Sequence, residues 1–146
     1  MRTAYWAWSM ILFVAIVVQV GLAGYGAFYS ANKLDEAGAT IDEDVYFEGF
    51  GAHAIVGYLV LLGGLILLVL GVAAGIGKWR LGRHGVLFGL LILQVLLAWF
   101  GFGVPAIGFF HPINALAIVA LAAWISWDEL RYRREGSAAS PAAAAA

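Results

Sequence analysis

Four long apolar runs most strongly limit how this chain can fold. They lie at residues 6–29, 49–76, 84–104 and 107–127, and each supplies the roughly 20 helical residues that cross a hydrocarbon core of about 30 Å. The chain has 146 residues, of which 64% are hydrophobic and 12% charged, too few charges to cover a soluble globule of this size. We therefore predict an all-α, multi-pass integral membrane protein whose single domain, residues 1–134, is a four-helix bundle made of two helical hairpins.

Basic residues gather on one side of this four-span arrangement. Lys33 alone lies on the other side, beside an acidic loop at about residues 30–47. By the positive-inside rule, both termini are predicted in the cytoplasm of a bacterial-type inner membrane. Short basic clusters beside membrane helices do not form a nucleic-acid-binding face. The Ala-rich tail at residues 135–146 has nothing to bury and is predicted to be disordered. The basic residues of the first side are Arg2, Lys78, Arg80, Arg83, Arg131, Arg133 and Arg134.

A short pattern occurs twice along the chain. Gln-Val-x-Leu-Ala-x-x-Gly begins at Gln19 and again at Gln94, and each copy is followed by a histidine, His53 or His111. One interpretation is chance similarity among common apolar residues. The other is an internal repeat, in which two hairpins pack about a pseudo-symmetry axis. Polar side chains inside apolar spans are costly and commonly functional, which directs attention to these four residues.

His53 and His111 are predicted near the outer ends of the second and fourth spans. Small residues follow each histidine at helical spacing, which fits close helix packing or room for a flat macrocycle. Under the second interpretation the cofactor is haem b, and its iron lies between His53 and His111. A third interpretation leaves both as interfacial histidines with local hydrogen bonds. The small residues are Gly57, Gly64 and Gly71 after His53, and Ala115 and Ala122 after His111.

Four polar residues are candidates to order the histidine rings or to contact the haem propionates. They are Gln19, Gln94, Asn114 and Glu48. Depth tests the pairing of the histidines, because His111 lies about 25 Å from the inner end of its span and His53 about 36 Å from the end of its own. The rings can meet only if the second span is tilted or ends near Gly71.

The third histidine, His84, starts the third span beside Arg83. We expect it to face lipid headgroups without a ligand. The pairs Gly71/Gly75 and Gly85/Gly89 are predicted helix-packing motifs. The sequence contains no HExxH motif and no phosphate-binding glycine loop, and the centres of the apolar runs lack Asp and Glu. This pattern disfavours a pump with a carboxylate relay.

The stretches from Gln94 through Pro105 to His111, and from Gln19 through Glu48 to His53, resemble the repeated half of the haem A synthase family over residues 11–123. The resemblance implies a four-helix bundle with paired haem-ligating histidines on its second and fourth helices, here His53 and His111, and a glutamate near the haem, here Glu48. One bundle replaces the family's two, and Ala54 stands where an arginine is usual. The chain also looks like small four-span bacterial membrane proteins of unknown function.

These observations predict a membrane b-type haem protein with bis-histidine ligation near the outer leaflet, for electron transfer or haem handling. Enzymatic haem modification is less well supported than a carrier role. A homodimer would restore the duplicated architecture of the resembled family. The alternative is a cofactor-free accessory or scaffold subunit of a larger membrane complex. In that case His53 and His111 should not converge, and Gly57 or Gly64 should face outward.

Overall fold

The chain folds into four long helices and one short helical turn. The computed structural model describes residues 1–35, 38 and 40–138, with the side chains of residues 136–138 left out. All four long helices are long and apolar enough to cross a membrane. The predicted all-α, four-helix, multi-pass class is therefore confirmed. The helices are α1 (Arg2–Leu34), α2 (Glu43–Ala73), α3 (Lys78–Gly103), α4 (Pro105–Gly108, the single turn) and α5 (Phe110–Ala138).

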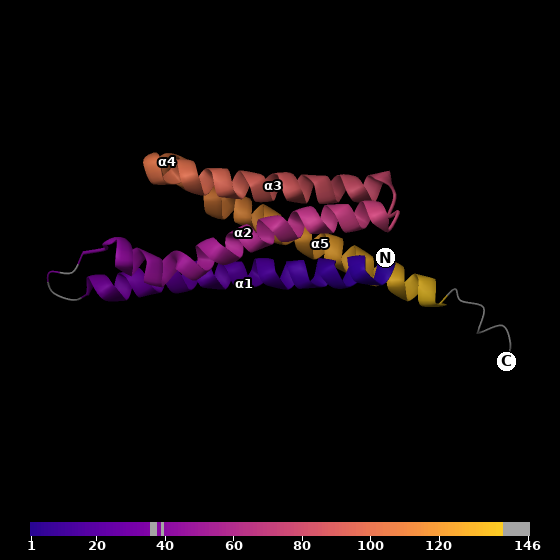
Figure 1. Ribbon diagram of the computed structural model, residues 1–146, viewed down its shortest axis with the longest axis horizontal. Coiled ribbons are helices and arrows are strands. Elements are labelled where there is room, and N and C mark those ends of the chain that lie inside the picture. The colour runs from indigo at the N-terminus through magenta and orange to yellow at the C-terminus, as the bar shows by residue number, and fades with distance from the viewer. Residues whose placement is uncertain (36–37, 39, 139–146) are drawn as a thin grey trace.

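The long helices form a bundle in which each one packs against two neighbours. α1 and α3 each contact α2 and α5, so α2 and α5 lie diagonally across the bundle. One end of the bundle, here called the terminal end, holds the start of α1, the end of α5 and the α2–α3 turn (Figure 1). The other end, here called the loop end, holds the α1–α2 connection and α4 (Figure 1). α2 runs obliquely, from beside α1 at the loop end to beside α3 at the terminal end (Figure 1). Because α2 is tilted, His53 can lie at the same depth as His111 although its helix is longer below it.

The helix ends follow from local chemistry. Asp42 caps α2, because its side chain accepts a hydrogen bond of 2.9 Å from the Val45 N–H. The tight α2–α3 turn uses Gly75 and Gly77 at φ +62° and +89°, values that favour glycine. α3 ends before Val104, because a residue that precedes a proline, here Pro105, favours an extended backbone.

The boundaries differ from the sequence prediction at the α1–α2 connection and at the end of α5. α1 continues to Leu34, so the connection to α2 covers residues 35–42 rather than about 30–47. α5 continues to Ala138, so residues 135–138 of the predicted disordered tail are helical, and residues 139–146 lie outside the described residues. Each extension contains some good helix formers, namely Ala31, Lys33 and Leu34 in α1 and Glu135 and Ala138 in α5.

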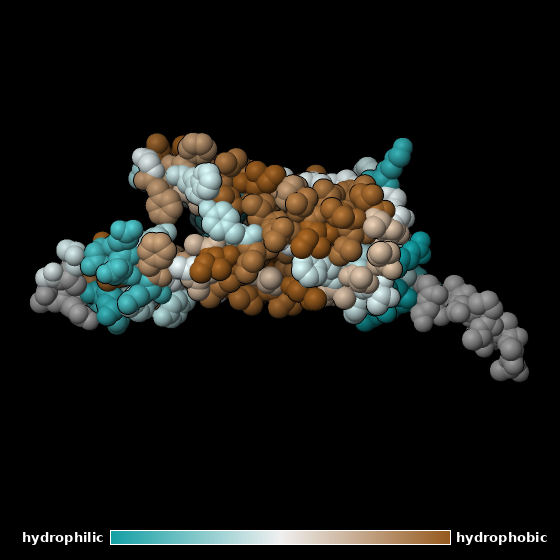
Figure 2. All heavy atoms as spheres, viewed as in Figure 1, coloured by the Kyte–Doolittle hydropathy of each residue, from teal (hydrophilic) through white to brown (hydrophobic). Residues whose placement is uncertain are grey.

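Side chains from all four long helices fill the centre. The face shown in Figure 2 is apolar through the middle of the molecule, and hydrophilic residues gather at the terminal end and on the α1–α2 side of the loop end. This distribution is expected for a protein whose central part contacts hydrocarbon. Gly64 allows close packing, since a Cβ there would lie 2.5 Å from Leu91 Cδ1. Among the described residues, the buried hydrophobic ones are Tyr5, Leu12, Ile16, Val60, Leu67, Leu87, Leu91, Ile118, Ala122 and Ile125.

The two predicted glycine packing motifs have different outcomes. A Cβ at Gly71 would contact the Ile76 and Leu81 side chains, so this glycine lies at a close approach. At Gly85 and Gly89 a Cβ would meet no described atom within 4 Å. Within the described part of this chain, therefore, these two glycines do not bring helices close together. The spacing defined their shared helix face correctly but could not show whether a helix of this chain covers it.

Candidate functional site

His53 and His111 meet in the interior of the bundle, towards the loop end. His53 comes from α2 and His111 from α5, the diagonal pair, and their ring centres lie 6.3 Å apart with the ring planes at 67°. Both side chains are half-buried. The structure thus brings together the two histidines that the sequence paired.

His53 is held by Gln19 of α1 through two reciprocal contacts. Its Nδ1 lies 3.1 Å from the Gln19 carbonyl oxygen, and Gln19 Nε2 donates to the His53 carbonyl oxygen at 2.6 Å. A carbonyl oxygen only accepts, so Nδ1 carries the hydrogen in this contact. Nε2 of the neutral ring is then left with a lone pair, the form in which histidine binds metals.

His111 makes one such contact, with Gln94 of α3. Its Nδ1 lies 3.0 Å from the Gln94 carbonyl oxygen. Asn114 fixes that glutamine in turn, because its Nδ2 donates to Gln94 Oε1 at 2.7 Å and to the Leu90 carbonyl oxygen at 2.9 Å. Asn114 itself is buried. In both hairpins, therefore, a backbone carbonyl of the glutamine orients the ring and frees Nε2.

A cavity of about 680 Å³ surrounds the two imidazoles. His53, His111, Gln19 and Gln94 are among its polar lining residues, and most of its wall is aliphatic or aromatic. The molecule is hollowed at the loop end, between the α1–α2 side and the α3–α4 side (Figure 2). Such a mostly apolar cavity with a few convergent polar groups is typical of a cofactor or small-molecule site.

Aromatic side chains that the sequence analysis did not single out line the loop end of this cavity. The Tyr46 ring stacks on Phe50 at 5.3 Å between ring centres and meets the edge of Phe102 at 5.8 Å. Phe50 also contacts the His53 ring edge-on at 6.4 Å. The spacing of residues 46 and 50 by one helical turn was the available signal, because residues i and i+4 share a helix face.

The polar candidates beyond the histidines fall into different places. Gln19 and Gln94 line the cavity, whereas Asn114 acts through Gln94. Gln19 Oε1 is buried without a hydrogen-bond partner in the described part of the chain, so it is an unused acceptor beside the cavity. Glu48 is exposed at the loop end, where it accepts a hydrogen bond from the Tyr29 hydroxyl.

The two glycine candidates serve different purposes. Gly57 lines the cavity, and a Cβ there would lie 2.8 Å from Gln19 Nε2. Gly57 therefore leaves the space through which the Gln19 amide reaches the His53 carbonyl. Gly64 lies two turns further along α2, in the packed contact with Leu91 rather than in the described cavity wall. Both glycines face neighbouring helices, not outward.

Gly57→Ala should weaken this support without unfolding the protein. The inserted methyl displaces the flexible end of Gln19 and removes a hydrogen bond worth about 1 kcal/mol. The replacement also adds about 1 kcal/mol of helix propensity, so the two effects nearly cancel. Gly51→Ala is the matched control on α2, because its Cβ meets only Phe47 at an ordinary 3.6 Å.

We expect the free energy of unfolding of Gly57→Ala to be about 1 kcal/mol below that of Gly51→Ala, measured by denaturant titration in detergent. The difference should vanish when each glycine change is made separately in Gln19→Ala protein and the two double variants are compared. A difference that persists without the Gln19 side chain would contradict the role assigned to Gly57.

His84 is buried inside the bundle and does not face lipid headgroups, so that prediction is wrong. Its residue exposure is 2%, and its Nε2 lies 2.8 Å from the Tyr5 hydroxyl oxygen. The guanidinium groups of its sequence neighbours Arg80 and Arg83 contact Glu129 and Asp128. The sequence placed His84 correctly near the start of α3, but Tyr5 of α1, which contacts its ring, lies 79 residues away in the chain.

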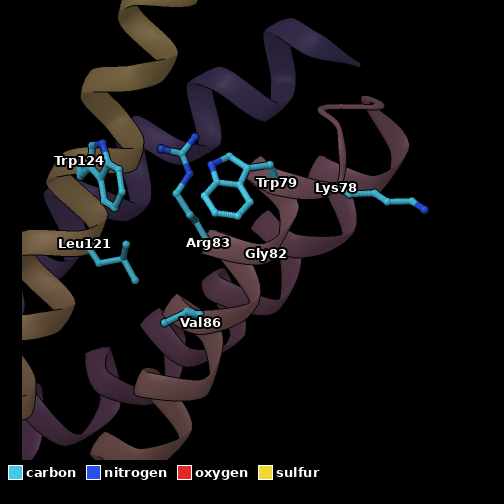
Figure 3. A pocket seen from close by; sticks show the side chains of 7 residues that line it. All are labelled: Lys78, Trp79, Gly82, Arg83, Val86, Leu121 and Trp124. Atoms are coloured by element: carbon cyan, nitrogen blue, oxygen red, sulfur yellow. The ribbon is translucent and has the colours of Figure 1, made fainter.

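A second pocket of about 380 Å³ lies between α3 and α5 at the terminal end. Figure 3 shows Arg83 and Trp79 extending from α3 on the side of Trp124, while Lys78 extends away from them. The Arg83 guanidinium lies 4.9 Å from the Trp124 ring centre and donates to Asp128 at 2.5 Å. The charge beside this pocket is thus already paired.

Comparison with known proteins finds no matching family model, no matching curated protein and no matching solved structure. The resemblance to the haem A synthase family stays a prediction, carried by the residues quoted for it.

Proposed function

We propose that the chain is a membrane b-type haem protein in which His53 and His111 are the two axial ligands. The observation that carries this proposal is the convergence of the two rings at 6.3 Å between centres. A metal binds a histidine nitrogen at about 2 Å, and that nitrogen lies roughly 1 Å from its ring centre, so two rings on opposite sides of one metal have centres roughly 6 Å apart. The observed separation fits this arrangement.

The donor set also fits haem. Each ring uses Nδ1 in a hydrogen bond to a glutamine carbonyl, which leaves two Nε2 nitrogens. Two axial nitrogens are what the iron of a porphyrin lacks, since the macrocycle supplies the other ligands. The cavity volume of about 680 Å³ lies within the range of about 300–1,000 Å³ for cofactor and ligand sites.

The residues of this chain would bind, orient and shield such a group. Gln19 and Gln94 hold the imidazole tautomer and raise the basicity of the ligating nitrogen, while Asn114 keeps Gln94 in place. The apolar wall limits water and so influences the redox potential of bound iron. When bound, the haem supplies one-electron redox chemistry.

Electron transfer or haem handling is the function class that this ligation favours. If His53 and His111 both hold the haem, its iron would have no open position for oxygen or a substrate. Haem hydroxylation is therefore a weaker candidate, and the role assigned by resemblance to Glu48 is weaker too, since its carboxylate is engaged by Tyr29 outside the cavity wall of the described residues.

Orientation and partners belong to the same proposal. The terminal end carries seven of the eight basic residues, which supports a cytoplasmic location for both termini in a bacterial-type inner membrane. The matching contacts of His53 with Gln19 and of His111 with Gln94 support two repeated hairpins.

A homodimer would double this bundle. Crosslinking in native membranes should then capture a dimer, and exclusive recovery of monomer would remove this part of the proposal.

The test is a dithionite-reduced minus oxidised absorbance spectrum of wild-type protein purified in detergent from cells supplied with haem. We expect a low-spin b-type signal and a stoichiometry of one haem per chain on titration of haem-free protein. A colourless protein that also fails to bind added haem would overturn the proposal and favour the cofactor-free accessory subunit, for which pull-down from native membranes would be the next experiment.

A further inference from the structure

A second buried polar cluster lies at the terminal end of the bundle. It joins three helices through Tyr5 of α1, His84 and Arg80 of α3, and Glu129 of α5. The residue exposures of Tyr5, His84 and Glu129 are 2%, 2% and 5%. Buried ionisable side chains in a membrane bundle are costly and commonly functional.

The hydrogen bonds of the cluster form one chain. His84 Nδ1 lies 2.8 Å from the Arg80 carbonyl oxygen, and His84 Nε2 lies 2.8 Å from the Tyr5 hydroxyl oxygen. The same hydroxyl oxygen lies 2.7 Å from Glu129 Oε1. The Arg80 guanidinium also donates to this carboxylate oxygen.

Counting hydrogens shows that ordinary protonation states do not satisfy this chain. The Arg80 carbonyl only accepts, so His84 Nδ1 must carry its hydrogen. Two contacts then remain, from His84 Nε2 to Tyr5 and from Tyr5 to Glu129, and each requires a hydrogen. The Tyr5 hydroxyl supplies only one of them. With a neutral His84 and an ionised Glu129, one contact would bring two lone pairs together in a buried site, which is unfavourable.

We propose that Tyr5, His84 and Glu129 form a proton-binding site that holds one proton more than a neutral imidazole, a hydroxyl and a carboxylate. With this proton on His84, Nε2–H donates to Tyr5 and the Tyr5 hydroxyl donates to Glu129. When Nε2–H passes its proton to the Tyr5 oxygen, the Tyr5 hydroxyl proton passes to Glu129 Oε1. The products are a neutral His84 and a protonated Glu129, and the reverse shift restores the first state.

The added proton gives this cluster a net charge of +1, because Arg80 already balances the Glu129 carboxylate. Arg80 stays beside Glu129 and packs on the Tyr132 ring at 4.1 Å, while the nearby Arg83 is paired with Asp128. α2 contributes no titratable side chain at this end, since residues 59–76 contain none. The titratable groups of this hydrogen-bond chain therefore come from α1, α3 and α5.

This site is separate from the cavity around His53 and His111. His84 precedes Gln94 by ten residues on α3, or about 15 Å along the helix. The inference therefore does not rest on haem binding.

The test determines the protonation of both ends of the chain at pH 7. Full-length protein with ¹⁵N-labelled histidine is examined by NMR, with the His84 signals assigned through His84→Asn. The Glu129 carboxyl group is examined by infrared difference spectroscopy, assigned through Glu129→Gln. We expect either hydrogens on both His84 nitrogens or a protonated-carboxyl band that Glu129→Gln removes. If wild-type protein shows a His84 Nε2 without hydrogen together with an ionised Glu129, the proposal is overturned without any variant.

A matched pair of tyrosine variants tests the connecting role of Tyr5. Tyr5→Phe removes the hydroxyl that both contacts share, so we expect loss of the extra proton at both ends. Tyr132→Phe is the control, because Tyr132 lies beside Arg80 on α5 but is exposed and outside the hydrogen-bond chain. Tyr5→Phe protein that retains helix content and the wild-type protonation signals would show that Tyr5 does not connect the two groups.

Discussion

His53→Ala and His111→Ala should each abolish the low-spin haem spectrum. Either change removes one of the two imidazoles that converge at 6.3 Å between ring centres. Loss of a hydrogen-bond partner of a metal ligand commonly lowers metal affinity by about 10- to 100-fold, so loss of the ligand itself should lower haem affinity by more. Haem titration of purified variants, followed by absorbance, measures both effects.

Gln94→Ala is the matched control for His111→Ala. The His111 ring is oriented by the Gln94 carbonyl, which alanine retains. The variant loses the contact from Asn114 to Gln94 Oε1 but keeps both axial ligands. We therefore expect a low-spin spectrum and an affinity loss smaller than that of either histidine variant. A wild-type spectrum in His53→Ala or in His111→Ala would contradict the assignment of that residue as a ligand.

Gly101→Ala should destabilise the protein and weaken the site together. A Cβ at Gly101 would lie 2.7 Å from the Gly108 Cα and 3.1 Å from the Gly108 nitrogen. These are backbone atoms, so the end of α3 and the turn of α4 must move apart. Overpacking of this kind commonly costs about 1–3 kcal/mol. Gly108 lies three residues before His111, so we expect haem affinity to fall as well.

Gly103→Ala provides the control from the same helix. A Cβ at Gly103 would meet no described atom within 4 Å. Its free energy of unfolding should therefore match the wild type within about 1 kcal/mol, or rise slightly through helix propensity. Denaturant titration in detergent of both variants, without haem, separates packing from ligand binding. Equal stability of the two variants would contradict the close approach of Gly101 and Gly108.

The sequence predicted the helices and the histidine pair because both depend on local patterns. Long apolar runs determine which segments can span a membrane, and helical spacing places Gly57 below His53 on one face. The polar repeat pointed to Gln19 and Gln94. It could not show that their carbonyls, rather than their amide groups, contact the histidine rings, because every residue has a carbonyl and only packing decides which one a ring reaches.

The remaining features depend on contacts between distant segments. Tyr5 meets His84 across 79 residues of sequence and Glu129 across 124. No spacing rule links such positions, so His84 was predicted from its basic sequence neighbours alone. The same limit applies to Gly64 and Gly85. A small residue on a helix face permits close packing, but the tilt of α2 and the bundle order decide whether another helix lies there.

The most direct test of the central proposal is electron paramagnetic resonance of oxidised, haem-loaded wild-type protein. Two axial imidazoles give low-spin ferric iron, and the 67° angle between the His53 and His111 ring planes predicts the large g anisotropy of crossed ligand planes. A high-spin signal would mean that at most one of these histidines binds the iron, and it would contradict the bis-histidine site.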